Sequence, residues 1–432
     1  MNIATIQGID HEGRGIARVD GKAVFIEGAL PQETVSYRLT RSKKHFDEAE
    51  MLAVLQPSPH RISPRCRHYR TCGGCSWQHV RSDVQVAYKQ RILEEQLQRL
   101  SNIQPQQYLP AIYGRSWGYR QRARLSVAYP AGGKAVFGFQ SRHSHRIVDI
   151  QECPVLSPRL AEQLGSVRRL LNEVGGAGAD IGAVELHQGE EACALTLHGR
   201  RFPPPVLAVL RKQAAAWSRQ GWQLYLQTGR QAEPLLPAEA GLFYRLPEYG
   251  LTLPYRPGDF TQINAETNAL MVRRALALLA PQAGERIADL FCGLGNFSLP
   301  IAACGAETVG MEGAAALTER AEANARLNGL AGRTRFVHTD LFDTTPQTVA
   351  EWGRFDKMLL DPPRSGAYAV VQALHAPYLP KRIVYVSCNP ATFARDAAVL
   401  VQKGYRFRSA GIINLFAQTA HVETVACFDW GE

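Results

Sequence analysis

The C-terminal part of the chain, from about residue 255, alternates strand-like and helical segments. This alternation is typical of a doubly wound α/β sheet, whose strands are parallel and whose helices cover both faces. The first strand, residues 287–290, runs into a glycine-rich turn and then a helical segment. Ligands of such open sheets bind beyond the carboxyl ends of the strands, so we expect the chemistry of this protein at that edge.

The glycine turn at residues 291–297 has neither the Gly-Lys-Ser/Thr of a P-loop nor the third glycine of the dinucleotide fingerprint. The next strand, residues 308–312, ends in Glu312. A carboxylate at this place can accept hydrogen bonds from both hydroxyls of a ribose. A glycine turn with an acidic strand end, and without a basic residue for a pyrophosphate, favours S-adenosylmethionine over NAD as the cofactor.

A short buried strand is predicted at residues 383–386, and Ser387, Cys388, Asn389 and Pro390 follow it. The residue before a proline avoids the α region, so the chain turns here and Cys388 is expected at the carboxyl end of the strand. A thiol in this place is either a small core residue or a nucleophile. Another predicted strand, residues 421–425, brings a second carboxylate close to the same edge.

Four of the nine cysteines are spaced suggestively. Cys66, Cys72 and Cys75 have the spacing C-x5-C-x2-C, and Cys153 precedes a proline, as a ligand cysteine does in ferredoxin-type loops. Four sulfurs suit an iron–sulfur cluster or zinc, whereas Cys72 and Cys75 alone suit a redox dithiol. An odd number of cysteines without a visible signal peptide argues against a disulfide framework.

The net charge of +10 is concentrated in residues 61–160, which hold 16 Lys and Arg but only 5 Asp and Glu. Such a block favours a polyanionic partner, with nucleic acid the first candidate, although a solvated surface gives the same charge. Arg120, Arg122 and Arg124 alternate along a predicted strand and match the spacing of a phosphate backbone. No stretch is apolar enough to span a membrane, so a cytoplasmic location is expected.

Residues 2–55 contain five strand-like segments with a hairpin signal at Asp20-Gly21 and a basic loop at residues 41–44. This pattern predicts a small barrel of the oligonucleotide-binding (OB-like) kind or, alternatively, a barrel used only for packing. The stretch resembles the TRAM domain, which begins several RNA-modifying enzymes. A helix is predicted at about residues 82–100.

Several motifs together make the chain similar to the uracil-C5 RNA methyltransferases over nearly its whole length. They are the segment at residues 260–264, the glycine turn, Asp-Pro-Pro-Arg at 361–364, Ser-Cys-Asn-Pro at 387–390 and His-Val-Glu at 421–423. Within this family, the barrel and the four cysteines resemble those of the enzymes that modify 23S rRNA and carry a 4Fe–4S cluster. Another rRNA uridine, or a tRNA, is the alternative target.

The resemblance implies roles for particular residues. Cys388 would add to C6 of the uracil, and Glu423 would remove the proton from C5. The side chains implied to line the S-adenosylmethionine site are Gln262, Phe291, Asn296, Glu312, Asp340 and Asp361. The implied ligands of the 4Fe–4S cluster are Cys66, Cys72, Cys75 and Cys153.

The expected fold is therefore multidomain. A small all-β, OB-like (TRAM) barrel occupies residues 1–56, and a central α+β RNA-binding domain with the Fe–S site occupies 57–254. A C-terminal α/β doubly wound, Rossmann-like methyltransferase domain occupies 255–432, and the helix at 82–100 is expected to pack on it. The implied partner is 23S rRNA, and a monomer without an obligate protein partner or a membrane is expected.

Overall fold

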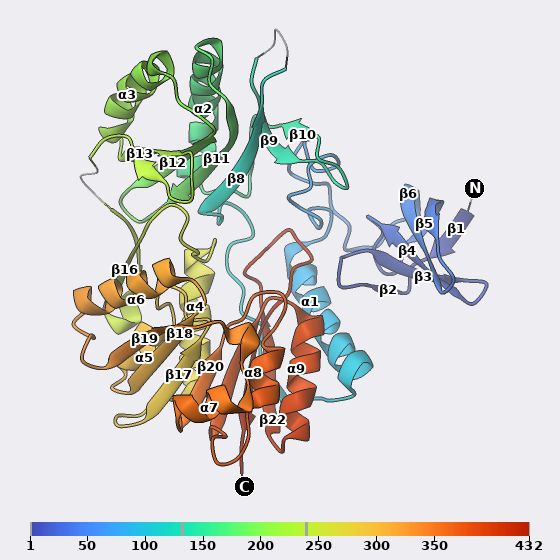
Figure 1. Cartoon of the computed structure of the whole chain (residues 1–432). Coiled ribbons are helices and arrows are strands. Elements are labelled where there is room, and N and C mark those ends of the chain that lie inside the picture. Colours follow the sequence, from blue (N-terminus) through green and yellow to red (C-terminus); the bar gives the residue numbers. More distant parts are fainter. Residues whose placement is uncertain (1, 131–133, 238–240, 432) are drawn as a thin grey trace.

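The computed structural model describes residues 2–130, 134–237 and 241–431. It has three parts, a small β unit (blue), a central α/β unit (green) and a C-terminal α/β unit (yellow to red) (Figure 1). None of the helices within the described ranges is long and apolar enough to cross a membrane.

The N-terminal unit is a six-stranded sheet with the order β1-β5-β6-β4-β3-β2. Its strands are β1 (Asn2–Thr5), β2 (Gly8–Ile9), β3 (Gly15–Val19), β4 (Lys22–Glu27), β5 (Thr34–Ser42) and β6 (Phe46–Gln56). The predicted hairpin joins β3 to β4, where Asp20 and Gly21 both have positive φ, as a two-residue hairpin turn needs.

The predicted basic loop at residues 41–44 is wrong in its extent. Strand β5 continues to Ser42 because Arg41 and Ser42 pair with Glu48 and Asp47 of β6. Opposite charges across an antiparallel pair stabilise it, and Lys22 adds an ion pair to Asp47 at 2.7 Å. The loop is therefore reduced to residues 43–45, and the unit has six strands, where the sequence predicts five.

The central unit is a seven-stranded sheet with the order β10-β9-β8-β11-β12-β13-β14. Two helices, α2 (Pro158–Gly176) and α3 (Pro204–Ser218), pack on it (Figure 1). Helix α2 buries leucines and valines at helical spacing, from Leu160 to Val174, and so supplies one side of this core. The strands are β8 (Arg122–Ala128), β9 (Val136–Gln140), β10 (Ile147–Asp149), β11 (Ile181–Gln188), β12 (Cys193–Gly199), β13 (Trp222–Gln227) and β14 (Glu233–Pro234).

The prediction that Arg120, Arg122 and Arg124 share one face of a strand is wrong. Arg120 lies before β8, and its Nε donates to the carbonyl oxygen of Arg122 at 2.9 Å. The Nε of Arg122 donates to Glu185 at 2.7 Å, and its Nη1 donates to the backbone of Asp259 at 2.9 Å. Only Arg124 is largely exposed. A buried carboxylate on the neighbouring strand, that of Glu185, therefore pairs with the central guanidinium of the three.

The C-terminal unit is an eight-stranded sheet with the order β19-β18-β17-β20-β21-β23-β22-β7. The first five strands in this order are parallel, and β23 is antiparallel to both neighbours. The predicted doubly wound sheet is confirmed. Its strands are β7 (Gln107–Tyr108), β17 (Arg286–Leu290), β18 (Glu307–Glu312), β19 (Thr334–His338), β20 (Lys357–Leu360), β21 (Arg382–Ser387), β22 (Arg406–Ile413) and β23 (Glu423–Asp429).

Successive residues of the central strands enter two cores on opposite faces of this sheet. Ile287, Leu359 and Val384 pack with α4 (Ala265–Leu279), α5 (Ser298–Ala303) and α6 (Ala315–Leu327). Ala288 and Ile383 pack on the other side. The helices of that side are α1 (Ser82–Gln96), α7 (Pro346–Trp352), α8 (Tyr368–Ala373) and α9 (Pro390–Gln402).

Three connections complete the fold. Helix α1, which a π-helical turn (Leu97–Ser101) extends, packs against α9 and β22 (Figure 1). Strand β7 pairs with β22 at the edge of the C-terminal sheet. A hairpin of β15 (Leu242–Leu246) and β16 (Leu251–Tyr255) contributes to the α4–α6 core. The domain boundaries at residues 56 and 254 stay predictions. Helix α1, strand β7 and most of this hairpin precede residue 254 in the chain but pack on the C-terminal unit.

Candidate active site

A cleft of about 820 Å³ lies at the carboxyl ends of the parallel strands. It brings together residues that follow β17, β18, β20 and β21, as the topology of an open sheet requires. Every residue that the sequence predicts for the cofactor and for the chemistry lies in its wall. These residues are Gln262, Phe291, Asn296, Glu312, Asp340, Asp361, Cys388 and Glu423.

The glycine turn forms one end of the cleft. Phe291, Gly293 and Gly295 have φ of +65°, +56° and +99°, so the backbone turns sharply after β17. The carboxylate of Glu312 accepts hydrogen bonds from the N–H groups of Gly293 at 3.0 Å and Ala314 at 2.9 Å. These bonds fix the carboxylate beside the turn, where a ribose would meet it.

Neighbouring polar groups hold the other residues at the glycine-turn end of the cleft in place. Asn296 exchanges two hydrogen bonds with Asn268 of α4, at 2.9 and 3.0 Å, and accepts one from the hydroxyl of Tyr244 at 2.9 Å. The ring of Phe291 lies 5.7 Å from that of Phe342, centre to centre, and both rings line the cleft. An apolar rim beside a polar end suits a ligand that has an aromatic base and a ribose.

The chemistry end of the cleft is built on a tight turn after β21. The hydroxyl of Ser387 accepts from the N–H of Asn389 at 3.2 Å, which closes the turn around Cys388. Asn389 then caps α9, because its Oδ1 accepts from the N–H of Ala391 at 3.0 Å. The cap is locally encoded, since an asparagine before Pro390 combines a favoured capping residue with a favoured first helical residue.

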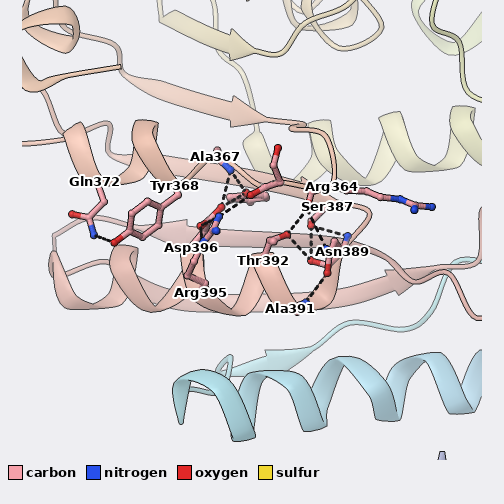
Figure 2. Close-up of polar contacts among 12 residues, drawn as sticks. Arg364, Ala367, Tyr368, Gln372, Ser387, Asn389, Ala391, Thr392, Arg395 and Asp396 are labelled. Atoms are coloured by element: carbon pink, nitrogen blue, oxygen red, sulfur yellow. Dashed lines mark hydrogen bonds and ion pairs between the residues drawn. The ribbon is translucent and has the colours of Figure 1, made fainter. Parts of the chain in front are cut away.

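The same turn holds the Asp-Pro-Pro-Arg segment. The backbone oxygen of Arg364 accepts from Nδ2 of Asn389 and Oγ1 of Thr392, each at 3.1 Å, while its side chain points away (Figure 2). Further along, the buried carboxylate of Asp396 accepts from the N–H of Ala367 at 2.7 Å (Figure 2). The loop after β20 is therefore fastened to α9 at two points, and this fixes Asp361 relative to Cys388.

Burial favours the neutral forms of the groups that meet here. Burial raises the pKa of the Cys388 thiol to about 12, with the charges of Glu423 and Asp361 acting in the same direction and that of Arg364 against them. It also raises the pKa of Glu423, which is only 3% exposed, well above the usual range. The pKa of Asp361 is raised to about 8, first by burial and then by Asp289. The Cys388 thiol and the carboxyl groups of Glu423 and Asp361 thus lie in one cleft with raised pKa values. A charged ligand bound in the cleft would change how far each of them ionises.

A second cavity of about 590 Å³ reaches Cys388 from the side of the N-terminal unit. Its wall includes Arg14 and Glu27 from the barrel, Gly74 from the cysteine segment, and Arg364 and His421 beside the thiol. Cys388 and Gly74 line both this cavity and the larger cleft. The thiol is therefore accessible both from the glycine-turn end of the larger cleft and from a groove that starts at the barrel.

The four predicted cluster ligands lie close enough to influence one another. Burial raises the pKa of Cys75 to about 12, and the charges of Cys153, Cys72 and Cys66 contribute to this rise. Cys75 and Cys153 also pack against one small apolar group around Tyr119. Within the described ranges, however, no three His, Cys, Asp or Glu side chains are arranged to hold a metal ion.

Some contacts of this region have no signal in the sequence. Lys89 is fully buried on α1, and its Nζ donates to Asn414 and to the backbone of Phe416. Arg364 donates to Nδ1 of His421 at 3.1 Å, across the groove mouth. Each of these contacts spans tens or hundreds of positions, so neither periodicity nor motif spacing predicts it.

Known proteins agree with this architecture. The chain matches the TRAM domain family over residues 4–52 and the tRNA (Uracil-5-)-methyltransferase family over residues 342–429. It is 50% identical to the 23S rRNA (uracil(1939)-C(5))-methyltransferase RlmD of Neisseria lactamica, over 99% of this chain and 96% of that protein. The RlmD of Aromatoleum aromaticum is 49% identical, over 99% of this chain and 100% of that protein. The chain belongs to the RlmD family of 23S rRNA (uracil-C5)-methyltransferases.

The fold is shared more widely than the sequence. The tRNA (uracil-54, C5)-methyltransferase of Pyrococcus abyssi, in complex with S-adenosyl-L-homocysteine, aligns with a TM-score of 0.74 at 22% identity. The alignment covers 99% of this chain and 100% of that one. The family membership confirms the predicted TRAM barrel, the methyltransferase fold and the expectation of an enzyme. The roles of individual residues stay predictions.

Proposed function

We propose that this methyltransferase transfers a methyl group from S-adenosylmethionine to C5 of a uridine in 23S rRNA through a covalent adduct of Cys388 with C6. The relatives are named for uracil 1939, and we propose the same target, with another rRNA uridine or a tRNA as the alternative. The observation that supports the reaction best is one cleft that holds the glycine turn, Cys388 and Glu423 together.

The cofactor end of the cleft suits S-adenosylmethionine, which supplies an electrophilic methyl group on a sulfonium. The carboxylate of Glu312 accepts the ribose hydroxyls, and the rings of Phe291 and Phe342 offer an apolar face to the adenine. Asp340, whose side chain caps the turn that carries Phe342, is held at the same end. Gln262, Asn296 and Asp361 complete the wall towards the thiol.

The reaction needs a nucleophile because C5 of uracil is itself a poor one. The thiolate of Cys388 forms a bond to C6, and the electron pair of the C5–C6 double bond moves to make C5 enolate-like. C5 then takes the methyl group, and S-adenosylhomocysteine leaves. The carboxylate of Glu423 removes the proton from C5, the double bond re-forms, and the thiolate is expelled.

The uracil must leave its stack to reach Cys388, which costs a few kcal/mol. The groove from the barrel to the thiol carries Arg364, whose positive charge suits an RNA backbone, whereas Arg14 and Arg142 in its wall are paired with Asp10 and Glu27. In this proposal the barrel and the cysteine segment contact the RNA along this groove, which reaches Cys388.

The Cys388→Ala variant tests this proposal. It should lose methyl transfer to a 23S rRNA fragment while still binding S-adenosylmethionine, since none of the polar contacts at the cofactor end involves the thiol. Cys304→Ala, at an exposed cysteine outside the cleft, is the matched control and should keep full activity. Normal turnover by Cys388→Ala would refute the covalent mechanism.

We also propose that Cys66, Cys72, Cys75 and Cys153 hold a 4Fe–4S cluster. The support is their spacing and the mutual effect of the four thiols on their pKa values. Their side chains would have to converge on the metal as it binds. Anaerobically purified protein should be brown and contain iron and sulfide. A colourless, zinc-loaded protein would refute the cluster.

A further inference from the structure

Lys89 is an unusual residue in the core of this molecule. It lies on α1, and its side chain is fully buried. Ile92 and Leu93, one turn further along the same helix, are buried in the apolar core that α1 shares with the C-terminal sheet. A lysine on that face leaves water at a large free-energy cost, which packing alone does not offset. Its place therefore needs an explanation from its contacts.

The contacts of Lys89 are with the loop between β22 and β23. Its Nζ donates to Oδ1 of Asn414 at 2.7 Å and to the backbone oxygen of Phe416 at 2.9 Å. Phe416 lines the large cleft, and Glu423 begins the strand that follows the loop. The amine thus fastens the segment that delivers Glu423 to the cleft.

Gln85 fastens the same loop one turn earlier on α1. Its Nε2 donates to Oε1 of Gln418 at 3.1 Å, and its Oε1 accepts from the N–H of Gln418 at 2.9 Å. Gln418 has a positive φ of +66°, which two such bonds help to maintain. Two buried residues at i and i+4 therefore hold one loop, but only one of them can carry a charge.

Lys89 and Glu423 also act on each other electrostatically. Among the residues that the structure describes, Lys89 is the only basic side chain whose charge lowers the pKa of Glu423, against the effects of burial and of Asp361. In return, burial lowers the pKa of Lys89 to about 7, and Glu423 is the group that opposes this shift. The two groups are coupled through the interior, and the described residues form no ion pair to Lys89 that would absorb its charge.

The other titratable groups around Glu423 do not replace this charge. Asp361, after β20, and the thiol of Cys388, after β21, are both acidic. His421, two residues before Glu423, has its pKa lowered to about 4 by burial and by Arg364, Lys89 and Arg120, so it is neutral at pH 7. Arg364 and Arg120 act on His421 and are not among the groups that shift the pKa of Glu423.

We propose that Lys89 is a positioning residue for the methyl-transfer reaction, whose buried ammonium holds the β22–β23 loop and favours the carboxylate form of Glu423. The proposal rests on the proposed role of Glu423 as the base that removes the C5 proton. A base buried beside another acid is protonated without a nearby cation, and a protonated carboxyl group cannot accept that proton. Lys89 supplies the cation without entering the cleft.

The test uses the full-length enzyme and a 23S rRNA fragment labelled with tritium at C5 of uridine. Tritium release into water reports loss of the C5 proton, and an SDS-resistant protein–RNA band reports the adduct. In Lys89→Met and Lys89→Gln, tritium release at pH 7 should be about tenfold slower, which corresponds to a shift of one pKa unit in Glu423. The adduct should accumulate, and higher pH should restore the rate.

Gln85→Met is the matched control because it weakens the same loop from the same helix without removing a charge. It should not accumulate the adduct or shift the pH profile, whatever its overall rate. If the Lys89 variants instead lose activity as Gln85→Met does, with no adduct and an unchanged pH profile, Lys89 is only a loop anchor and the proposal is wrong.

Two further variants separate the remaining outcomes. Asn414→Asp keeps Lys89 but places a carboxylate at the position 2.7 Å from its Nζ. This carboxylate would pair with the ammonium and offset its positive charge. It should reproduce the adduct and the pH shift even if the Lys89 variants do not fold, and a wild-type profile would overturn the proposal. Glu423→Gln should accumulate the adduct at every pH. If it does not, the proposed role of Glu423 fails, whatever Lys89 does.

Discussion

The thiol of Cys388 and the thiols of the four-cysteine group have the same resting chemistry but different surroundings. Burial raises the pKa of Cys388 and of Cys75 to about 12. The charges near Cys388 are the carboxylates of Glu423 and Asp361 and the guanidinium of Arg364, whereas those near Cys75 are the other three thiols. Burial therefore does not distinguish the proposed nucleophile from the proposed metal ligands in this molecule, and the neighbouring groups do.

The two places are also built differently. A turn of consecutive residues holds Cys388, with Ser387 and Asn389 bonded to each other on either side of it. The cysteine segment depends on distant partners instead. Gly73 donates to the backbone of Gln140 at 2.9 Å, and Nη2 of Arg142 donates to the backbone oxygen of Cys75 at 2.6 Å. Local sequence encodes the first arrangement, and tertiary contacts make the second.

The largest expected effect comes from removing the carboxyl group of Glu423 next to Cys388. Glu423→Gln keeps the shape of the side chain but cannot accept the C5 proton, so turnover should fall by roughly 10²–10⁴, the usual contribution of a general base. The thiol would still add to C6, and the enzyme should be trapped on its RNA as an SDS-resistant adduct.

A double variant supplies the control for this experiment. Cys388→Ala with Glu423→Gln should form no adduct, because the bond to C6 needs the thiol. An adduct in the double variant would mean that a different nucleophile attacks the uracil. No adduct in the single variant would place the base elsewhere in the cleft.

The next effect should appear only in the four-cysteine group. Cys75→Ser removes one proposed cluster ligand, so the protein should lose iron, sulfide and its visible absorption. The melting temperature should fall, by roughly 2–4 °C for each kcal/mol of lost stability if the affected unit has 150–250 residues. Cys388→Ser is the matched control and should keep the iron. Equal iron contents in the two variants would contradict the assignment of the cluster to Cys75.

The contrast between local and distant contacts also explains what the sequence predicts. Cys388 at a strand end and Glu312 at the end of the second strand follow from short motifs, and the structure places both in one cleft. The burial of Lys89 does not follow, because α1 has the composition of an ordinary surface helix. The pairing of Arg122 with Glu185 is equally invisible, since 63 positions separate the partners.

The smallest effects should come from the link between the cysteine segment and the barrel. Arg142 donates to the backbone oxygens of Tyr69 and Cys75 and pairs with Glu27 of β4 at 2.9 Å. In the protein without its cluster, Arg142→Lys should speed the alkylation of Cys75 by about tenfold. A lysine does not make these bonds together, and a hydrogen bond to a charged group contributes about 1.5–3 kcal/mol. Mass spectrometry of the alkylated peptides measures the rate, and Cys388 should react as in the wild type.

Glu27→Gln removes the ion pair with Arg142, and weakens a contact with His143 at 3.0 Å, while it leaves the carbonyl contacts of Arg142 in place. The pair is partly exposed, so its loss should cost only about 0.2–1 kcal/mol and speed the alkylation of Cys75 by no more than about fivefold. An effect of Glu27→Gln as large as that of Arg142→Lys would mean that the barrel, through Glu27, orders the cysteine segment. An effect of either variant on Cys388 would mean that the two kinds of cysteine site are not independently built.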